Sequence, residues 1–459
     1  MVSVLNMSTT PHTEHLVLIF AYHYPPENAI GGARPYRFAK YLSRLGYTCR
    51  VFTAADQSGR DDPNTEYVPD PFVARPRHSF SWQLARAVRK FFLPGDIGMH
   101  WSYHASRAAR ACIRAHPGAR VTIFSSFPPL GSHLAGWQLA RGNGMTWIAD
   151  CRDPLADEFR DQQRTLSQKR VYRWLERVVA QRADAVIANT DAALVRWQEK
   201  FPSFKNKFHL IWNGFDPEER INPLPALSRD CKLLSHVGEL YHGRNATPIL
   251  ESIARLIAAN RLPAGSVRVR LIGTAQAACL PGSEFIQRAK SEGWLDVVTQ
   301  QIPQREATHV SQTSNGLLLL QSQSADHVPA KIFEYLQIGR PILALVKPNS
   351  PAERLLEGSG VPYRCVYPGC TAEAVDEIVA SFFDLPSTAV APSPWFEEQF
   401  NAERQTRVLD LIIRSLHSEE PSRKLLAPIP HSHATVRSPF VEGPQSHRSG
   451  TISSAPTMK

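Results

Sequence analysis

The sequence predicts an α/β protein made of two Rossmann-like domains, each with a doubly wound parallel sheet. Short apolar runs of the kind that form buried strands alternate with helical stretches, and a polar, proline-rich segment interrupts this alternation near the middle. With 459 residues, 43% of them hydrophobic, the chain is long enough for two separate cores. The repeated order strand, helix, strand predicts crossover units, which build parallel sheets.

The first domain is expected over residues 16–221, after an N-terminal extension at 1–15. Its first strand, Leu16–Ala21, leads through a glycine pair into a helix over Ala33–Leu45, which Gly46 ends. The further strands expected are Cys49–Thr53, Val121–Ser125, Met145–Ala149, Ala185–Ala188 and His209–Trp212, and the further helices are Gly131–Arg141 and Thr165–Arg182.

Residues 222–228 read as a linker because they are polar and rich in proline. The second domain is expected over 229–393. Its predicted strands are Lys232–Val237, Val267–Ile272, Val297–Thr299, Gly316–Leu320 and Ile342–Val346, and its helices are Thr247–Ala259, Phe285–Glu292, Ala330–Ile338, Ala352–Glu357 and Ala372–Phe383. A C-terminal segment at 394–417 is expected to form one helix over 394–416, and the tail at 418–459 is expected to be disordered.

The composition excludes several classes of protein. Seven scattered cysteines without a CxxC pair predict reduced thiols and a cytoplasmic protein rather than a disulfide framework or a zinc site. The N-terminus lacks the pattern of a signal peptide, and no apolar run approaches the roughly 20 residues of a membrane helix. We therefore expect a cytoplasmic protein that could also lie on the inner face of the membrane.

Positive charge is concentrated in part of the first domain. The net charge is +10. The stretch from Arg75 to Arg120 contains nine basic residues and a single acidic residue, Asp96. Within this stretch, Ser81–Leu93 mixes Trp, Leu and Phe with Arg and Lys, as amphipathic helices on anionic membranes do. An ordinary packed helix with a solvated charged face is the alternative.

The segment Asp326–Leu336 contains the sharpest candidate site. Pro329 stands where a helix would begin, and Lys331 and Glu334 are three residues apart on one face of that helix. A cation for a phosphate beside a carboxylate for ribose hydroxyls suits a nucleotide sugar. Taken alone, the spacing favours an exposed surface ion pair.

Two glycine-bearing turns are candidate anion sites. In the second domain, Gly238 and Arg244 lie between the first strand and the first helix, where free backbone amides and a guanidinium could meet a diphosphate. In the first domain, Gly31 and Gly32 occupy the equivalent turn and would allow a ligand to approach the backbone closely. An ordinary turn between strand and helix is the alternative for both.

Three charged residues, Asp150, Arg152 and Asp153, directly follow the strand Met145–Ala149. At the end of an apolar strand they are expected to point away from the core. A carboxylate there could position an acceptor hydroxyl or assist its deprotonation. The alternative is an Asp–Arg pair that braces the loop.

The order of these motifs resembles glycosyltransferase family 4 (glycosyl transferases group 1) of bacterial polysaccharide synthesis, from about Leu16 to Leu416. The matching stretches are Tyr24-Pro25-Pro26-Glu27, Gly31-Gly32-Ala33-Arg34, Trp147–Pro154, Ile211–Asp216, His236-Val237-Gly238 and Val328–Leu336.

The resemblance implies a GT-B fold, with two Rossmann-like domains facing a cleft. It also implies a nucleotide-sugar donor on the second domain, an acceptor on the first, retention at the anomeric carbon, and no metal or other cofactor. Glu334 matches the family's ribose-binding acid, and Lys331 and Arg244 match the cations near the diphosphate. Asp326 stands where the family usually has Glu at the donor sugar, and Glu239 stands where a basic residue is usual.

The sequence thus predicts a retaining glycosyltransferase acting on a glycan acceptor that is lipid-linked. A nucleotide-sugar epimerase of the same fold would share the donor site but need no acceptor. A nucleic-acid-binding protein would fit the net charge, although the basic stretch lacks regular aromatic platforms and a reading motif. An inactive transferase would fit the two departures at Asp326 and Glu239.

Overall fold

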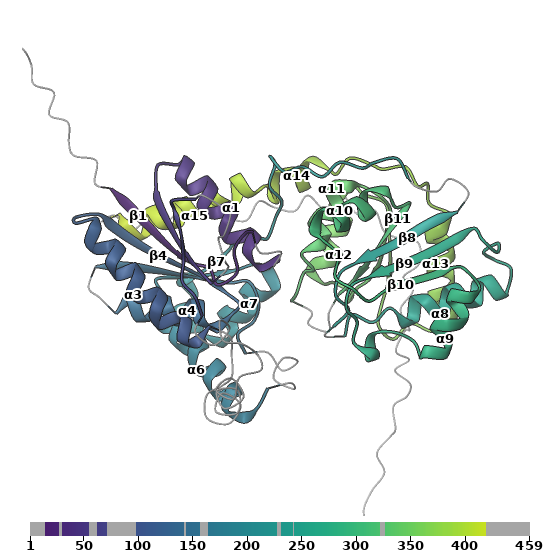
Figure 1. Ribbon diagram of the computed structural model, residues 1–459, viewed down its shortest axis with the longest axis horizontal. Helices are drawn as coiled ribbons and strands as arrows, with labels where there is room; N and C mark the ends of the chain where they lie inside the picture. Colours follow the sequence, from purple (N-terminus) through teal and green to yellow (C-terminus); the bar gives the residue numbers. More distant parts are fainter. Residues whose placement is uncertain are drawn as a thin grey trace, which may run out of the picture. The chain divides into compact units, whose positions relative to one another are not determined.

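The computed structural model describes residues 14–26, 30–54, 62–70, 98–141, 144–156, 164–226, 231–241, 243–321 and 326–418. These residues form two separate sheets in which every pair of neighbouring strands is parallel, each sheet with helices on both faces (Figure 1). The predicted fold class is confirmed. The residues around the first sheet are called the first domain below, and those around the second sheet the second domain.

The first sheet has seven strands in the order β3-β2-β1-β4-β5-β6-β7. Its strands are β1 (His15–Phe20), β2 (Thr48–Thr53), β3 (Thr65–Tyr67), β4 (Arg120–Phe127), β5 (Met145–Cys151), β6 (Ala185–Ala188) and β7 (Phe208–Leu210). The order turns back at β1, and this is where doubly wound sheets bind ligands beyond their carboxyl ends.

Helices cover both faces of this sheet because its central strands are apolar on both sides. The helices of this part of the chain are α1 (Ile30–Arg44), α3 (Met99–Ala115), α4 (Leu130–Ala140), α6 (Leu166–Arg182), α7 (Asp191–Lys200) and the 3-10 helix η1 (Pro202–Lys207). In β1, Leu16, Leu18 and Phe20 pack under α3, α4 and α6, whereas Val17 and Ile19 pack under α1. Successive side chains of a strand point to opposite faces, so one strand serves two cores.

The second sheet has six strands in the order β10-β9-β8-β11-β12-β13. Its strands are β8 (Lys232–Val237), β9 (Val267–Ile272), β10 (Leu295–Val298), β11 (Gly316–Leu320), β12 (Ile342–Leu345) and β13 (Tyr363–Val366). Its helices are α8 (Thr247–Ala258), the 3-10 helix η2 (Ala277–Cys279), α9 (Ser283–Ser291), α10 (Gln304–Thr313), α11 (Lys331–Ile338), α12 (Pro351–Ser359) and α13 (Ala372–Phe383). Again two cores form, one under α8 and α13 and the other under α11 and α12.

The C-terminal segment is two helices rather than the single helix predicted over 394–416. The helices α14 (Pro394–Gln399) and α15 (Ala402–His417) are separated at Phe400 and Asn401. Asn401 pairs with Phe215 in an isolated bridge, and its side chain accepts hydrogen bonds from the first amides of α15. This local capping starts a new helix, and α15 then packs with α1 on the first sheet.

Several elements are absent from the prediction: β3, α3, α7, α10 and β13. They are short or lack a long apolar stripe, so periodicity gives little signal for them. The amphipathic segment predicted at Ser81–Leu93 lies outside the described residues, as does the tail after 418. All seven cysteines are free thiols. No helix within the described ranges is both long and apolar enough to span a membrane.

Candidate active site

The second-domain candidate lies at the carboxyl edge of its sheet, where β8 and β11 end. Gly238 follows β8 directly and has φ 154°. A Cβ at Gly238 would lie 2.7 Å from Cε of Lys331, and a Cβ at Gly273 would lie 2.4 Å from the Gly238 carbonyl oxygen. Glycine is therefore required here because the loop and the Lys331 side chain pass in close contact.

Lys331 and Glu334 stand on the first turn of α11, which ends at Gly339 with φ 71°. Burial lowers the pKa of Lys331; the charge of Glu334 raises it and that of Arg244 lowers it. One carboxylate oxygen of Glu334, Oε1, is buried without a hydrogen-bond partner. Both side chains are half-buried at the edge of the sheet, so they are not the exposed surface pair that the spacing alone favours.

Arg244 approaches the same place from the loop after β8. Its guanidinium carbon lies 4.5 Å from the centre of the Tyr241 ring, and Nη1 donates to the Glu239 carbonyl oxygen at 3.3 Å. Its Nε is buried and has no hydrogen-bond partner. The sequence thus placed Gly238, Arg244, Lys331 and Glu334 in one site, and the structure brings them together.

His236, the penultimate residue of β8, also belongs to this cluster, although no role was predicted for it from the sequence. Its Nδ1 lies 2.9 Å from the Leu318 carbonyl oxygen. Burial lowers its pKa to about 4, opposed by that hydrogen bond and aided by the charges of Lys331 and Arg244. A carbonyl only accepts, so Nδ1 carries the proton and Nε2 is a free acceptor; Nε2 is buried without a partner. A histidine at the penultimate position of a buried strand is the signal that could have found it.

Asp326 and its neighbour His327 contact residues of the first domain. Asp326 forms an ion pair of 3.0 Å with Arg196, and its backbone oxygen accepts from Thr190 Oγ1 at 3.0 Å. His327 Nε2 lies 3.9 Å from Asp153. The Asp326 carboxylate is therefore held by an arginine, and a sugar hydroxyl would have to share it.

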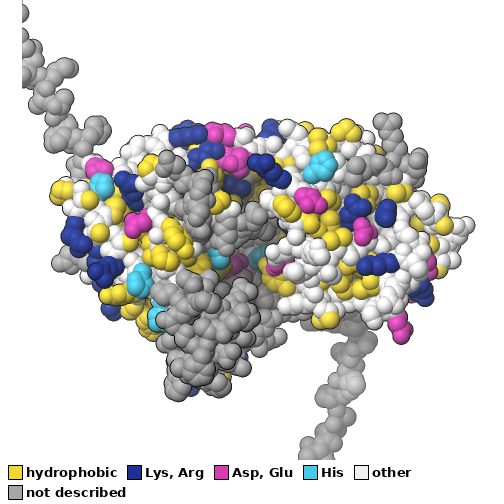
Figure 2. All heavy atoms as spheres, in the orientation of Figure 1, with side chains coloured by type: hydrophobic (Ala, Val, Ile, Leu, Met, Phe, Trp, Pro, Cys, Tyr) yellow, Lys and Arg dark blue, Asp and Glu magenta, His cyan; other side chains and the backbone are white. Residues whose placement is uncertain are grey.

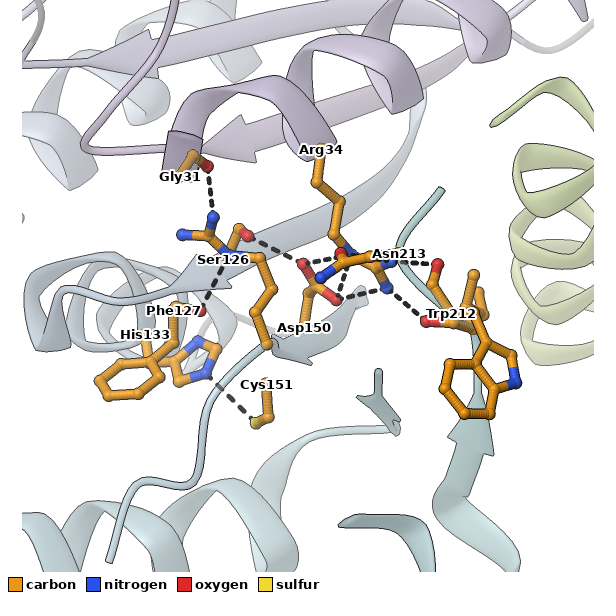
Figure 3. A network of polar contacts seen from close by, with 11 residues as sticks. Gly31, Arg34, Ser126, Phe127, His133, Asp150, Cys151, Trp212 and Asn213 are labelled. Carbon is orange, nitrogen blue, oxygen red and sulfur yellow. Dashed lines mark hydrogen bonds and ion pairs between the residues drawn. The ribbon is translucent and has the colours of Figure 1, made fainter. Parts of the chain in front are cut away.

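In the first domain, Asp150 does not point away from the core as expected. The strand β5 runs on to Cys151 and pairs Asp150 with Ser126 of β4, so Asp150 is completely buried. Its carboxylate accepts from Arg34 Nη2 at 2.9 Å, from Arg34 Nε at 3.1 Å and from Ser126 Oγ at 2.8 Å (Figure 3). Bracing by an Asp–Arg pair is what the structure shows, with Arg34 rather than Arg152 as the partner.

Arg152 braces the backbone around the two glycines. It donates to the carbonyl oxygens of Phe127 at 3.0 Å, Pro128 at 2.9 Å and Gly31. Phe127 and Gly31 are labelled in Figure 3. Gly31 and Gly32 are part of the first turn of α1 rather than a preceding loop. A Cβ at Gly32 would lie 2.8 Å from the Tyr24 Cα, so this glycine is explained by close packing of the helix on the chain before it.

A cluster of polar side chains in the core beside Asp150 was also not predicted from the sequence. His133 contacts Ser125 Oγ through Nδ1 at 2.8 Å and Cys151 Sγ through Nε2 at 3.5 Å, and Trp147 Nε1 donates to the same Ser125 Oγ at 2.8 Å. Burial lowers the pKa of His133 to about 3. Every member has a partner, as buried polar groups usually do, so this cluster stabilises the core. No three His, Cys, Asp or Glu side chains in the described ranges meet as metal ligands would.

Comparison with known proteins agrees with this fold. Residues 32–219 match the model of Glycosyltransferase Family 4. No curated protein matches the chain. Among solved structures, Anabaena HepE in complex with UDP-glucose has a TM-score of 0.53 and 13% identity, covering 87% of this chain and 99% of its own.

Two further structures extend the comparison. The catalytic domain of starch synthase IV from Arabidopsis thaliana, bound to ADP and acarbose, has a TM-score of 0.52 and 11% identity, covering 88% of this chain and 100% of its own. The UDP-GlcNAc 2-epimerase from Methanocaldococcus jannaschii has a TM-score of 0.50 and 10% identity, covering 87% and 99%. At these identities the similarity shows the fold. Residues 32–219 thus match Glycosyltransferase Family 4, and this match together with the GT-B fold identifies the chain as a glycosyltransferase.

Proposed function

We propose that this glycosyltransferase takes its sugar from a nucleotide-sugar donor held at the carboxyl edge of the second sheet. The observation that carries the proposal is the group of buried polar atoms without partners: His236 Nε2, Arg244 Nε and Glu334 Oε1. Such atoms are rare in folded proteins, because each costs about 1–3 kcal/mol. A ligand that supplies their hydrogen bonds removes this cost.

The chemistry of the cluster matches a nucleoside diphosphate sugar. Lys331 and Arg244 supply two cations for a diphosphate, and Arg244 offers a planar group suited to phosphate oxygens. Glu334 and His236 supply acceptors, which suit ribose or sugar hydroxyls. As the bond from sugar to diphosphate breaks, negative charge grows on the leaving diphosphate, and the two cations stabilise it.

The finer parts of the proposal are retention at the anomeric carbon without a metal ion, and transfer to a lipid-linked glycan in polysaccharide biosynthesis. Their support is the resemblance of motif order and the basic character of the first domain. Of the three charged residues proposed as catalytic, Asp150 and Arg152 are committed to internal contacts. Asp153 keeps a partly exposed carboxylate and is the acceptor-side candidate.

The test measures donor binding by the whole chain. Thermal unfolding and calorimetry are carried out with UDP-, GDP-, ADP- and dTDP-sugars. A donor at about 100 times its Kd should stabilise the fold by about 2.7 kcal/mol. Glu334→Gln removes the carboxylate charge and should weaken binding at least about tenfold, since charged hydrogen bonds contribute about 1.5–3 kcal/mol.

Glu284→Gln is the matched control, because Glu284 is also a first-turn acid, on α9, and is exposed. It should bind the donor as the wild type does. A wild-type chain that binds no member of the panel, or equal losses in both variants, would overturn the proposed site.

An epimerase is the second candidate, favoured by the structural similarity to the UDP-GlcNAc 2-epimerase. It would use the same donor cluster but would change the stereochemistry of the sugar without an acceptor. Incubation of the chain with the bound donor alone, followed by analysis of the sugar, separates the two. An epimerised sugar nucleotide would replace the transferase proposal.

A further inference from the structure

Three helices of the first domain lie side by side on one face of its sheet: α3, α4 and α6 (Figure 1). Their charge is one-sided. Neither α3 nor α4 contains an acidic residue, and the single acid of α6, Glu176, is buried and pairs with Lys200 at 2.5 Å. The three helices therefore place no acidic side chain on the outer surface.

The outer surface of these helices carries eight exposed arginines. They are Arg107, Arg110 and Arg114 of α3, Arg141 after α4, and Arg170, Arg173, Arg177 and Arg182 of α6. Figure 2 shows basic and histidine side chains interleaved with apolar ones at the left of the molecule, over the place of α3 in Figure 1. We call these eight arginines, with the exposed apolar residues between them, the arginine face.

The same pattern occurs on both outer helices. On α3, Tyr103 is followed at positions four, seven and eleven residues later by arginines; on α6, Leu166 is followed by arginines at the same three intervals. This spacing places each set in one stripe along a helix. Tyr103 is 57% exposed and Leu166 is 73% exposed, so each stripe begins with an apolar side chain open to solvent.

The helix α4 joins the two stripes. Its Trp137 packs edge-on against Trp174 of α6, with ring centres 5.2 Å apart, and the Arg141 guanidinium lies 3.9 Å from the centre of the Trp137 ring. On the other side, Arg110 of α3 donates to the Gln138 carbonyl oxygen at 3.1 Å. The arginine face is thus one continuous surface, with Trp174 40% exposed within it.

We infer that the arginine face docks on the surface of an anionic lipid bilayer. Basic residues near such a surface each add about 1 kcal/mol of attraction, and Trp, Tyr and Leu side chains between them enter the headgroup region. A polynucleotide would also attract the arginines, but it offers no favourable environment to an exposed Leu166. The role of this docking in catalysis rests on the proposed function, because a lipid-linked acceptor would lie in the same membrane.

The experiment is sedimentation of the full chain with vesicles, at low salt. Phosphatidylcholine vesicles are compared with vesicles that also contain phosphatidylglycerol. The wild type should bind only the anionic vesicles and should be released by salt. The triple variant Arg170→Glu, Arg173→Glu, Arg177→Glu should bind them about a hundredfold more weakly.

The matched control reverses three exposed charges of the second domain: Arg268→Glu, Arg288→Glu and Lys290→Glu. It changes the net charge equally and should bind vesicles nearly as the wild type does. Leu166→Ser should weaken binding without a change of charge, and Trp174→Phe should reduce the blue shift of tryptophan fluorescence that vesicles cause. Circular dichroism and the thermal midpoint check that each variant is folded.

Three outcomes would overturn the inference. The wild type could remain in the supernatant with anionic vesicles at low salt, or both triple variants could lose binding equally. The chain could also shift an oligonucleotide through Arg170, Arg173 and Arg177 while ignoring vesicles, and the face would then be a nucleic-acid site. Donor binding is measured on the same proteins: a chain that binds vesicles but no nucleotide sugar supports the docking face and contradicts the proposed function.

Discussion

At the scale of single residues, the candidate donor site contains one group that the sequence did not assign. His236 is neutral at ordinary pH because burial lowers its pKa to about 4, and its Nδ1 is engaged by the Leu318 carbonyl oxygen. Its Nε2 therefore offers a lone pair. Lys331 and Arg244 are the cations for a phosphate, whereas the neutral His236 Nε2 can accept a hydrogen bond from a hydroxyl group.

We expect His236→Asn to weaken nucleotide-sugar binding by about tenfold, equivalent to about 1.4 kcal/mol. The asparagine amide can still donate to the Leu318 carbonyl oxygen, but it lacks the acceptor at Nε2. Calorimetric titration with the donor measures the loss. His309→Asn is the control, since His309 is exposed on α10; unchanged affinity in His236→Asn would remove His236 from the site.

Asp150 lies in the core of the first domain rather than beyond its strand, where it was expected. A charged triplet after an apolar run was expected to lie beyond the strand. The strand β5 continues through Asp150 because β4 supplies a parallel partner as far as Phe127. Sequence periodicity does not report the length of the neighbouring strand, so the burial of this carboxylate could not be predicted.

At the scale of elements, α1 holds the chain that leaves the first sheet. Its basic residues recur every three or four positions along one face. Arg34 donates to the carbonyl oxygens of Ile211 and Trp212, Arg37 donates to that of Gly214, and Lys40 pairs with Asp216 at 2.8 Å. The helix therefore fixes the first part of the segment that leads to the second sheet.

This arrangement predicts the effect of Arg34→Met. It leaves the Asp150 charge buried without its partner and should destabilise the first domain by about 3–5 kcal/mol. Chemical denaturation followed by circular dichroism measures the change. Adding Asp150→Leu to Arg34→Met should recover part of the stability, because no buried charge then remains.

Arg44→Met provides the comparison on the same helix. Its ion pair with Glu218 is exposed, and water screens such pairs, so a much smaller loss is expected. Equal losses in Arg34→Met and Arg44→Met would contradict the importance of the buried pair.

At the scale of the whole molecule, three histidines make stability depend on pH. Burial lowers the pKa of His133 to about 3 and that of His236 to about 4. His15 is also lowered to about 4, first by burial and then by the charge of His417. All three lie below the ordinary value of 6.5, so the unfolded chain takes up protons first as the pH falls.

The free energy of unfolding should therefore be highest above pH 6.5 with respect to these groups and should fall progressively between pH 6.5 and pH 4. Urea denaturation at pH 7.5, 6 and 5 measures it. Replacement of His15 by Gln should reduce the dependence on pH within this window. A midpoint that is constant from pH 7.5 to 5 would contradict the assignment.

The sequence by itself determined the alternation of strands and helices, the parallel class of both sheets, and the neighbourhood of Gly238, Arg244, Lys331 and Glu334. The first two follow from local features, namely apolar runs and glycines at turns. That the four residues share one site is what the resemblance to the family implies. Four strands, β6, β8, β9 and β11, have the predicted bounds. The same local features account for the motif order that resembles the family.

Only the tertiary structure decided which charged groups are buried and which partners they have. Arg34 and Asp150 are 116 residues apart, and His236 meets Leu318 across 82 residues; neither contact leaves a mark on local periodicity. The arginine face likewise needs three helices, α3, α4 and α6, to pack in one layer. Burial and pairing depend on long-range packing, which sets the solvation of each charge, and a single sequence records that packing only indirectly.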